Sequence, residues 1–213
     1  MKSVLTKFLG AATLGVSLFA IAAPATAADA ESCKAVRFAD VGWTDIQVIT
    51  GIAANLFDAL GYASEVKTLS VPVTYASLKN KDVDVFLGNW MPSMTADVKP
   101  YFDDKSVEQL APNLEGAGYG VVVPQYVADA GVKSIADLAA NKDKFNGKFY
   151  GIESGNDGNR IIQTMIDDAK NNLAGFELVE SSEAGMLTEA EKAMKNNEWI
   201  LFLGWTPHPI MGD

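Results

Sequence analysis

Residues 77–88 read Ser77-Leu-Lys-Asn-Lys-Asp-Val-Asp-Val-Phe-Leu-Gly88, and the same outline returns as Ala193-Met-Lys-Asn-Asn-Glu-Trp-Ile-Leu-Phe-Leu-Gly204. The two stretches match at five positions without a gap, and both end on Phe-Leu-Gly. Each copy fits the end of a helix, a turn and a buried strand that stops at glycine, with a tryptophan soon after. Two such copies in one chain predict two lobes of similar build.

Short apolar runs alternate with helix-length amphipathic stretches along the rest of the chain, which is typical of an α/β protein. Short connections between such elements imply a mostly parallel sheet in each lobe. A capping box at Ser134 is expected to open a short helix. The pattern predicts strands at 35–39, 83–87, 119–123, 148–152, 176–179 and 199–203, and helices at 45–60, 159–170 and 183–197.

The composition is that of a globular protein and argues against several functions. The 213 residues are 48% hydrophobic and 21% charged, with a formal net charge of −10. Because only 17 Lys and Arg are spread along an acidic chain, no nucleic-acid partner is expected. One Cys and one His are too few for a Cys/His zinc site. No nucleophile motif accompanies His208, so we expect no metal, no cofactor and no catalytic residue.

The first 27 residues have the features of a secretory signal peptide. Lys2 and Lys7 give a basic start, residues 8–23 carry no charge, and small residues end at Ala27. The apolar run is short for a membrane anchor, which is the alternative. Since removal takes both lysines and no acidic residue, the net charge of −10 becomes −12. The remaining lone Cys33 is then a free thiol or half of a lost bridge.

Large aromatic residues lie beside glycines just past the predicted strands. Trp43, Trp90 and Trp205 have this setting, and Tyr119 lies between two glycines at the predicted strand 119–123. Trp199 heads a strand and is assigned to the core or to an interface. A single tryptophan of this kind more often packs over a sheet edge. Four of them at the edge where open α/β sheets bind ligands favour a binding surface.

Polar residues share this edge. Asp45 follows Trp43, and Asn156 and Asp157 follow the predicted strand at 148–152. Ring faces combined with a carboxylate attract cations, and each ring contact with a quaternary ammonium is worth roughly 0.5–2 kcal/mol. An ammonium that carries only methyl groups donates no hydrogen bond, so aromatic walls suit it better than polar walls.

At these residues the chain resembles the substrate-binding proteins of ABC importers for choline and glycine betaine, and most closely the choline-specific branch. The segments Gly-Trp-Thr-Asp (42–45), Gly-Asn-Trp-Met-Pro (88–92) and Gly-Trp-Thr-Pro-His-Pro (204–209) carry the match, which runs from Val36 to Pro209. The resemblance implies a two-lobed periplasmic-binding-protein (type II) fold with the ligand in the cleft, lobe 1 at 28–112 and lobe 2 at 113–213. It also implies a periplasmic, monomeric protein that is not an enzyme and serves a membrane permease.

By the same resemblance, Trp43, Trp90, Tyr119 and Trp205 form an aromatic box for the trimethylammonium group. Asp45 and Asn156 take the positions that contact the hydroxyl of choline. A buried, ionised Asp45 would repel the carboxylate of glycine betaine and accept a hydrogen bond from a hydroxyl, which favours choline. The alternative for Asp45 is a helix cap before Ile46.

The family pattern continues past Pro209, whereas this chain does not cross back to complete lobe 1. We therefore expect a truncated chain whose first lobe shows bare apolar side chains or free strand edges, with Cys33 unpaired. The alternatives to a choline receptor are a receptor for glycine betaine or a related osmoprotectant, an inactive fragment, and an exported hydrolase with the aromatics as a substrate platform.

Overall fold

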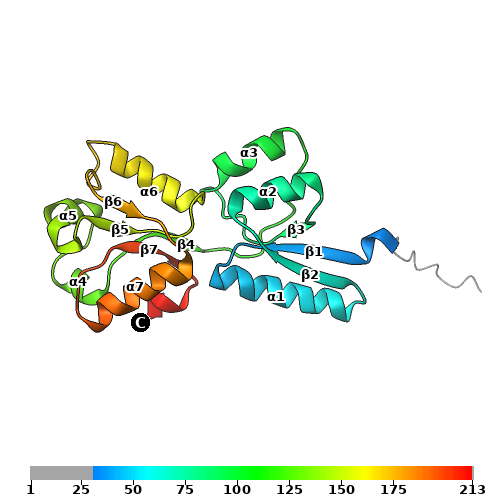
Figure 1. Cartoon of the computed structure of the whole chain (residues 1–213), viewed down its shortest axis with the longest axis horizontal. Coiled ribbons are helices and arrows are strands. Elements are labelled where there is room, and N and C mark those ends of the chain that lie inside the picture. The colour runs from blue at the N-terminus through cyan, green and yellow to red at the C-terminus, as the bar shows by residue number, and fades with distance from the viewer. Residues whose placement is uncertain (1–30, 213) are drawn as a thin grey trace, which may run out of the picture.

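The computed structural model describes residues 31–212, which form two lobes side by side (Figure 1). The signal peptide expected at 1–27 lies outside the described residues. One lobe holds a three-stranded sheet in the order β2-β1-β3, and the other a four-stranded sheet in the order β4-β7-β5-β6. Residues 104–117 join them without a helix or strand. The two-lobed α/β architecture predicted from the sequence is confirmed.

In lobe 1 the central strand β1 (Ala35–Asp40) pairs in parallel with β2 (Ala63–Thr68) and with β3 (Val85–Phe86). Helix α1 (Thr44–Ala59) lies on one side of this sheet, and α2 (Val71–Asn80) and α3 (Thr95–Asp103) lie on the other (Figure 1). A short 3-10 turn, η1 (Glu31–Cys33), precedes β1. The strand expected at 83–87 is reduced to two residues.

In lobe 2 the strands are β4 (Gly118–Val122), β5 (Lys148–Tyr150), β6 (Glu177–Val179) and β7 (Phe202–Thr206). The helices are α4 (Gln125–Asp129), α5 (Ile135–Ala140), α6 (Asp157–Asp167) and α7 (Glu183–Lys195), with 3-10 turns η2 (Lys142–Phe145) and η3 (Pro209–Gly212). The expected capping box is present at Ser134, with its partner Asp137.

Two expectations for lobe 2 need correction. Strand β7 begins three residues later than predicted, so Trp205 lies inside the strand and not beyond it. The cause is β4, which pairs with β7 in antiparallel fashion up to Thr206 and places Tyr119 directly opposite Trp205. The sheet is therefore mixed, although β5 pairs in parallel with both β6 and β7.

The internal similarity of the sequence extends to the backbone. Lys81 and Asn197 occupy the same position in the segments 77–88 and 193–204, and both are left-handed, with φ of 63° and 54°. A non-glycine residue in this region is uncommon and marks a tight helix end. The two lobes thus share a helix–turn–strand unit, and each unit leads to a tryptophan of the site.

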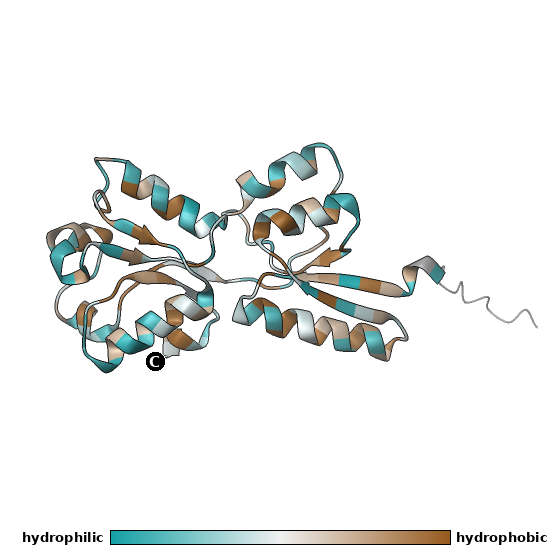
Figure 2. Cartoon of the chain, in the orientation of Figure 1, coloured by the Kyte–Doolittle hydropathy of each residue, from teal (hydrophilic) through white to brown (hydrophobic). Residues whose placement is uncertain are grey.

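Lobe 1 is less well covered than lobe 2. Four apolar side chains form an exposed stripe along α1 and its C-cap residue, from 58 to 73% exposed, at Val48, Ile52, Leu56 and Leu60. Brown segments run along this helix in Figure 2. The expectation of bare apolar side chains on lobe 1 is confirmed. Cys33 is exposed and unpaired, also as expected. Within 31–212 the structure contains no helix that is both long and apolar enough to cross a bilayer.

Candidate functional site

Four aromatic rings meet where the two lobes face each other. Trp43 precedes α1 and Trp90 follows β3, while Tyr119 and Trp205 are opposite one another in the β4–β7 ladder. Ring centroids lie 6.5 Å apart for Trp43 and Trp205, 5.8 Å for Trp90 and Tyr119, and 6.3 Å for Tyr119 and Trp205. Each lobe therefore contributes two rings to one cluster.

The rings enclose a small cavity, whose volume is about 10 Å³. This is roughly the smallest space that holds one water molecule, so the lobes are closed on each other. The wall is made of the four rings together with Ile152 and Asp157.

Hydrogen bonds across the lobes fix the planes of two indoles. Trp43 Nε1 of lobe 1 donates to both carboxylate oxygens of Glu153 in lobe 2, at 3.0 and 3.1 Å. In the opposite direction, Trp205 Nε1 of lobe 2 donates to Asp45 Oδ1 of lobe 1 at 3.1 Å. Because each ring is held by its polar edge, its electron-rich face is left for the cavity.

Asp45 is not a helix cap. Trp43 occupies the N-cap position of α1, and Asp45 lies within the first turn of the helix. Its second oxygen, Oδ2, is buried and has no hydrogen-bond partner among residues 31–212. Burial raises the pKa of Asp45, and the hydrogen bond from Trp205 offsets part of this effect. The Asp45 carboxylate is therefore held through Oδ1 by the indole N–H of Trp205, while its Oδ2 remains without a hydrogen bond among the described residues.

Asn156 lies next to the cavity but not on its wall. Its side-chain oxygen caps α6 by accepting a hydrogen bond from the backbone N–H of Asn159 at 2.9 Å, and its amide nitrogen donates to the Glu153 carbonyl. Both polar atoms are therefore occupied in this closed arrangement. The residue that points to the rings is the next one, Asp157.

Asp157 is the site residue that reasoning from the sequence did not select, although it was placed at the correct edge. It is 1% exposed, and its Oδ2 finds no hydrogen-bond partner in the described chain. Burial is the main cause of its raised pKa. The glycine that follows was the available signal, because a Cβ at Gly158 would collide with the Tyr119 hydroxyl. The ring therefore packs directly on the start of α6.

Buried acidic groups surround the cluster. Burial raises the pKa of Glu153 as well, and the nearby charges of Glu183 and Asp157 add to this effect. Glu183 is 3% exposed and links the lobes, since it accepts hydrogen bonds from Thr44 and lies 3.0 Å from His208 Nε2. Several desolvated carboxylates beside electron-rich rings make a strongly negative environment.

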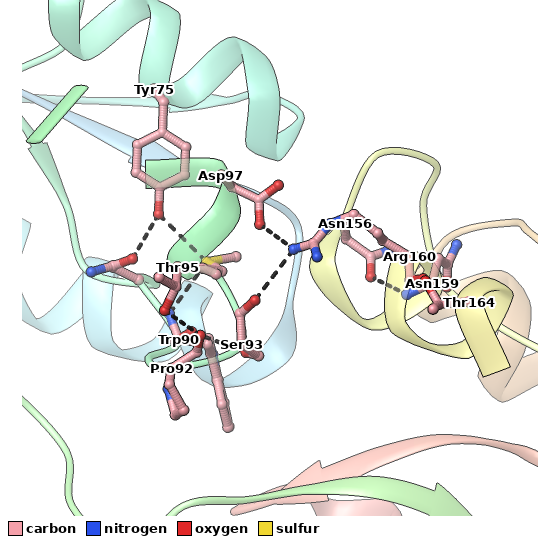
Figure 3. Close-up of polar contacts among 12 residues, drawn as sticks. Tyr75, Trp90, Pro92, Ser93, Thr95, Asp97, Asn156, Asn159, Arg160 and Thr164 are labelled. Atoms are coloured by element: carbon pink, nitrogen blue, oxygen red, sulfur yellow. Dashed lines mark hydrogen bonds and ion pairs between the residues drawn. The ribbon is translucent and has the colours of Figure 1, made fainter. Parts of the chain in front are cut away.

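The nearest cation is used elsewhere. Arg160 of α6 reaches across to lobe 1, where its Nη2 donates to Asp97 Oδ2 at 2.6 Å and to the Ser93 carbonyl at 3.3 Å (Figure 3). This pair closes the lobes at the outer side of the cluster and leaves Asp157 without a paired cation. No three His, Cys, Asp or Glu side chains within 31–212 are grouped to hold a metal ion.

Comparison with known proteins identifies the family to which this chain is similar. The model for the substrate binding domain of ABC-type glycine betaine transport systems matches residues 34–213. A protein of Chromohalobacter salexigens named Uncharacterized protein ORF1 is 53% identical over 145 residues, which is 68% of this chain and 94% of that protein.

Two solved structures share the fold. An ABC-transporter choline binding protein in complex with choline is 55% identical, with a TM-score of 0.83 over 86% of this chain and 64% of its own. Lactococcal OpuAC, closed on glycine betaine, is 27% identical, with a TM-score of 0.72 over 84% of this chain and 67% of its own. The chain thus spans just under two thirds of the solved choline-binding protein.

Proposed function

We propose, from the premise that this chain belongs to the family of substrate binding domains of ABC-type glycine betaine transport systems, that it binds choline for an ABC importer. Membership in this family makes it a solute-binding protein and not an enzyme. The observation that carries the proposal is the cluster of four rings beside two buried carboxylates, Asp45 and Asp157, each with one oxygen that has no hydrogen-bond partner among residues 31–212. The choline-bound relative supports the same ligand.

The geometry suits a ligand that bridges the lobes. Trp43 and Trp90 come from one lobe and Tyr119 and Trp205 from the other, so a trimethylammonium group between them contacts both lobes at once. Ring faces bind it through charge, at roughly 0.5–2 kcal/mol for each contact. Such a ligand stabilises the closed form over the open form, since it gains all four contacts only when the lobes meet.

Choline is favoured over glycine betaine by the buried carboxylates. Asp45 Oδ2 has no partner within the described residues, so it can accept a hydrogen bond from the choline hydroxyl. The carboxylate of glycine betaine would meet like charge there, and such repulsion costs several kcal/mol in typical interfaces. Asn156 is proposed as the second hydroxyl contact, which requires its amide to exchange its present partner, the Glu153 carbonyl.

Glycine betaine is the second candidate, because the family model and lactococcal OpuAC both refer to it. Isothermal titration calorimetry of the purified protein with each ligand separates the two. We expect choline to bind with a Kd of roughly micromolar order, near −8 kcal/mol, and glycine betaine to bind at least tenfold more weakly. Tighter binding of glycine betaine, or binding of neither, would overturn the proposal.

The remaining parts of the proposal concern setting and partners. We place the protein in the periplasm, as a monomer that delivers its ligand to the membrane permease of the importer. The signal peptide expected at residues 1–27 and the family of the chain support this location. Cell fractionation followed by size-exclusion chromatography tests both points, and recovery from the cytoplasm or as a stable dimer would contradict them.

A further inference from the structure

We infer that Asp157 supplies the negative charge that faces the quaternary ammonium inside the ring cluster, and that the site therefore selects ligands by their formal positive charge. This inference rests on the proposed function. It assigns separate roles to the two carboxylates that each have one oxygen without a hydrogen-bond partner among residues 31–212: Asp157 recognises the cationic end of the ligand, and Asp45 recognises the hydroxyl end.

The position of Asp157 is the first argument. It is the first residue of α6 and lines the cavity together with the four rings, while only 1% of its surface is exposed. Its Oδ2 has no hydrogen-bond partner among residues 31–212. Because the residue lines the cavity and this oxygen has no partner within the described part of the chain, a ligand in the cavity can supply the missing interaction.

The energetics give the second argument. A hydrogen bond with the Ser93 side chain satisfies only part of this carboxylate. A buried ionised group that lacks a charged partner remains costly, so such groups are normally paired. The positive end of the α6 dipole offsets part of this cost. The adjacent Arg160 offsets little, because it is bound to Asp97 and to the Ser93 carbonyl across the lobes. A cation that enters the ring cluster supplies the missing charge.

The chemical class of the cation follows from the walls. A primary ammonium carries three N–H donors that require acceptors, whereas the cluster offers ring faces, the Ile152 side chain and one carboxylate edge. A quaternary ammonium has no donor to satisfy and matches rings on several sides with one negative charge. Asp45 differs because it lies behind the Trp205 indole, which already holds its Oδ1.

Three probes separate charge from shape and from the hydroxyl. Choline carries both the charge and the hydroxyl, tetramethylammonium has the charge alone, and 3,3-dimethylbutan-1-ol is the neutral carbon analogue of choline. For Asp157→Asn we expect choline and tetramethylammonium to lose affinity by the same factor, about tenfold or more, with the alcohol unchanged. For Asp45→Asn we expect loss for choline and none for tetramethylammonium.

The outcomes are decisive. If Asp157→Asn weakens choline but not tetramethylammonium, Asp157 is a hydroxyl contact and the inference is wrong. If it changes neither ligand, the residue has no part in recognition. Failure of the unaltered protein to bind choline or tetramethylammonium would instead overturn the proposed function itself, so the two failures are distinguishable.

Folding is monitored by the melting temperature without ligand. Removal of an unpaired buried charge is expected to leave the melting temperature of Asp157→Asn unchanged or higher. Asp157→Ser serves as a second variant if the amide disturbs the start of α6, because serine is also well accepted near a helix N-terminus. Equal tetramethylammonium affinity in both well-folded variants and the unaltered protein would refute the role of the charge.

Discussion

The indole nitrogen of Trp205 in lobe 2 donates a hydrogen bond to Asp45 in lobe 1, at 3.1 Å. The relationship has a counterpart in the reverse direction, from Trp43 of lobe 1 to Glu153 of lobe 2. Each lobe therefore orients one ring of the other. The ring cluster acquires its complete geometry only when the lobes are closed. Closure gains these hydrogen bonds to carboxylates, together with those from Thr44 to Glu183 and from Arg160 to Asp97, in addition to any ligand contact.

The rings are expected to carry most of the affinity. Trp90→Ala should weaken choline binding about tenfold or more, which corresponds to roughly 1.4 kcal/mol per decade. Trp90→Phe should cost less because a ring face remains. Titration calorimetry measures both, with Trp199→Phe as the control, since Trp199 packs on Phe145 and Lys144 away from the cluster. Equal affinity of Trp90→Ala and the unaltered protein would show that Trp90 is a packing residue.

Asp45→Asn is expected to reduce the preference for choline over glycine betaine about tenfold, because the charge that repels a carboxylate is lost. The melting temperature should not fall, since Asp45 does not cap α1. Ser182→Ala provides the matched control. Ser182 does cap a helix, α7, by accepting from the Gly185 N–H at 3.1 Å, and its loss should cost about 1 kcal/mol of stability without changing ligand preference. Equal loss of both ligands by Asp45→Asn would contradict the prediction.

Choline binding should weaken as the pH falls. Burial raises the pKa of Asp45, Glu153 and Asp157, so these groups take up protons above the usual carboxylate range. Choline keeps its charge at every pH and favours their ionised forms. Its affinity should therefore rise with pH through the raised pKa values and fall as these carboxylates become protonated, which titration calorimetry across a pH series measures.

The same pH series with Asp157→Asn tests the source of this dependence. One titrating group is then missing, so the slope of log Kd against pH should be shallower. A profile that is flat in the unaltered protein, or equally steep in the variant, would exclude Asp157 as a contributor.

Arg160 is expected to act on closure and not on the ligand. Its ion pair with Asp97 joins the lobes and is partly exposed, so Arg160→Ala should reduce choline affinity only about twofold to fivefold, in line with roughly 0.2–1 kcal/mol for such pairs. Lys99→Ala removes a more exposed pair, Lys99–Asp103, that lies within α3 alone. Titration calorimetry should show no effect for this control, and equal losses in both variants would mean that the Arg160 pair has no special role.

The apolar stripe on α1 should tolerate polar substitution. Because Ile52 and Leu56 are 58 and 60% exposed, Ile52→Lys and Leu56→Lys should change the free energy of unfolding by no more than about 0.5 kcal/mol. Ile46→Ala, on the buried face of the same helix and 3% exposed, should cost about 2–5 kcal/mol. Urea denaturation measures all three. A large loss from either lysine variant would mean that the stripe is covered in solution.

The sequence alone was sufficient for the elements with strong local patterns. Helix α1 follows from its apolar periodicity, and α5 from the Ser134 and Asp137 capping box. Strand β2 was missed because Ala63–Thr68 reads Ala-Ser-Glu-Val-Lys-Thr, a mostly polar edge strand whose only large apolar side chain, Val66, is itself exposed. Helix α3 was missed because Pro100 lies inside it. Tertiary contacts decide such segments, and local propensity does not.

For the site, glycine-flanked aromatic residues and the family resemblance pointed to four rings that lie together in the structure, although Tyr119 and Trp205 lie inside strands and not beyond them. The sequence could not show which polar residue faces the rings, because Asn156 and Asp157 are adjacent and both follow β5. The position at which α6 begins decides this: Asn156 becomes the N-cap of the helix, and Asp157 lines the cavity. The register of β7 was likewise set by β4, a partner more than 80 positions away, and not by its own apolar run.

The antiparallel ladder between β4 and β7 has a kinetic consequence. Because Tyr119 and Trp205 are paired neighbours in one sheet, half of the ring cluster exists before the lobes meet. If the proposed ligand first meets this preformed half, substitutions of these two residues should change mainly the association rate. Substitutions of Trp43 and Trp90, which belong to the other lobe, should then change mainly the dissociation rate. Affinity and exchange rate can therefore be adjusted from different lobes of the same molecule.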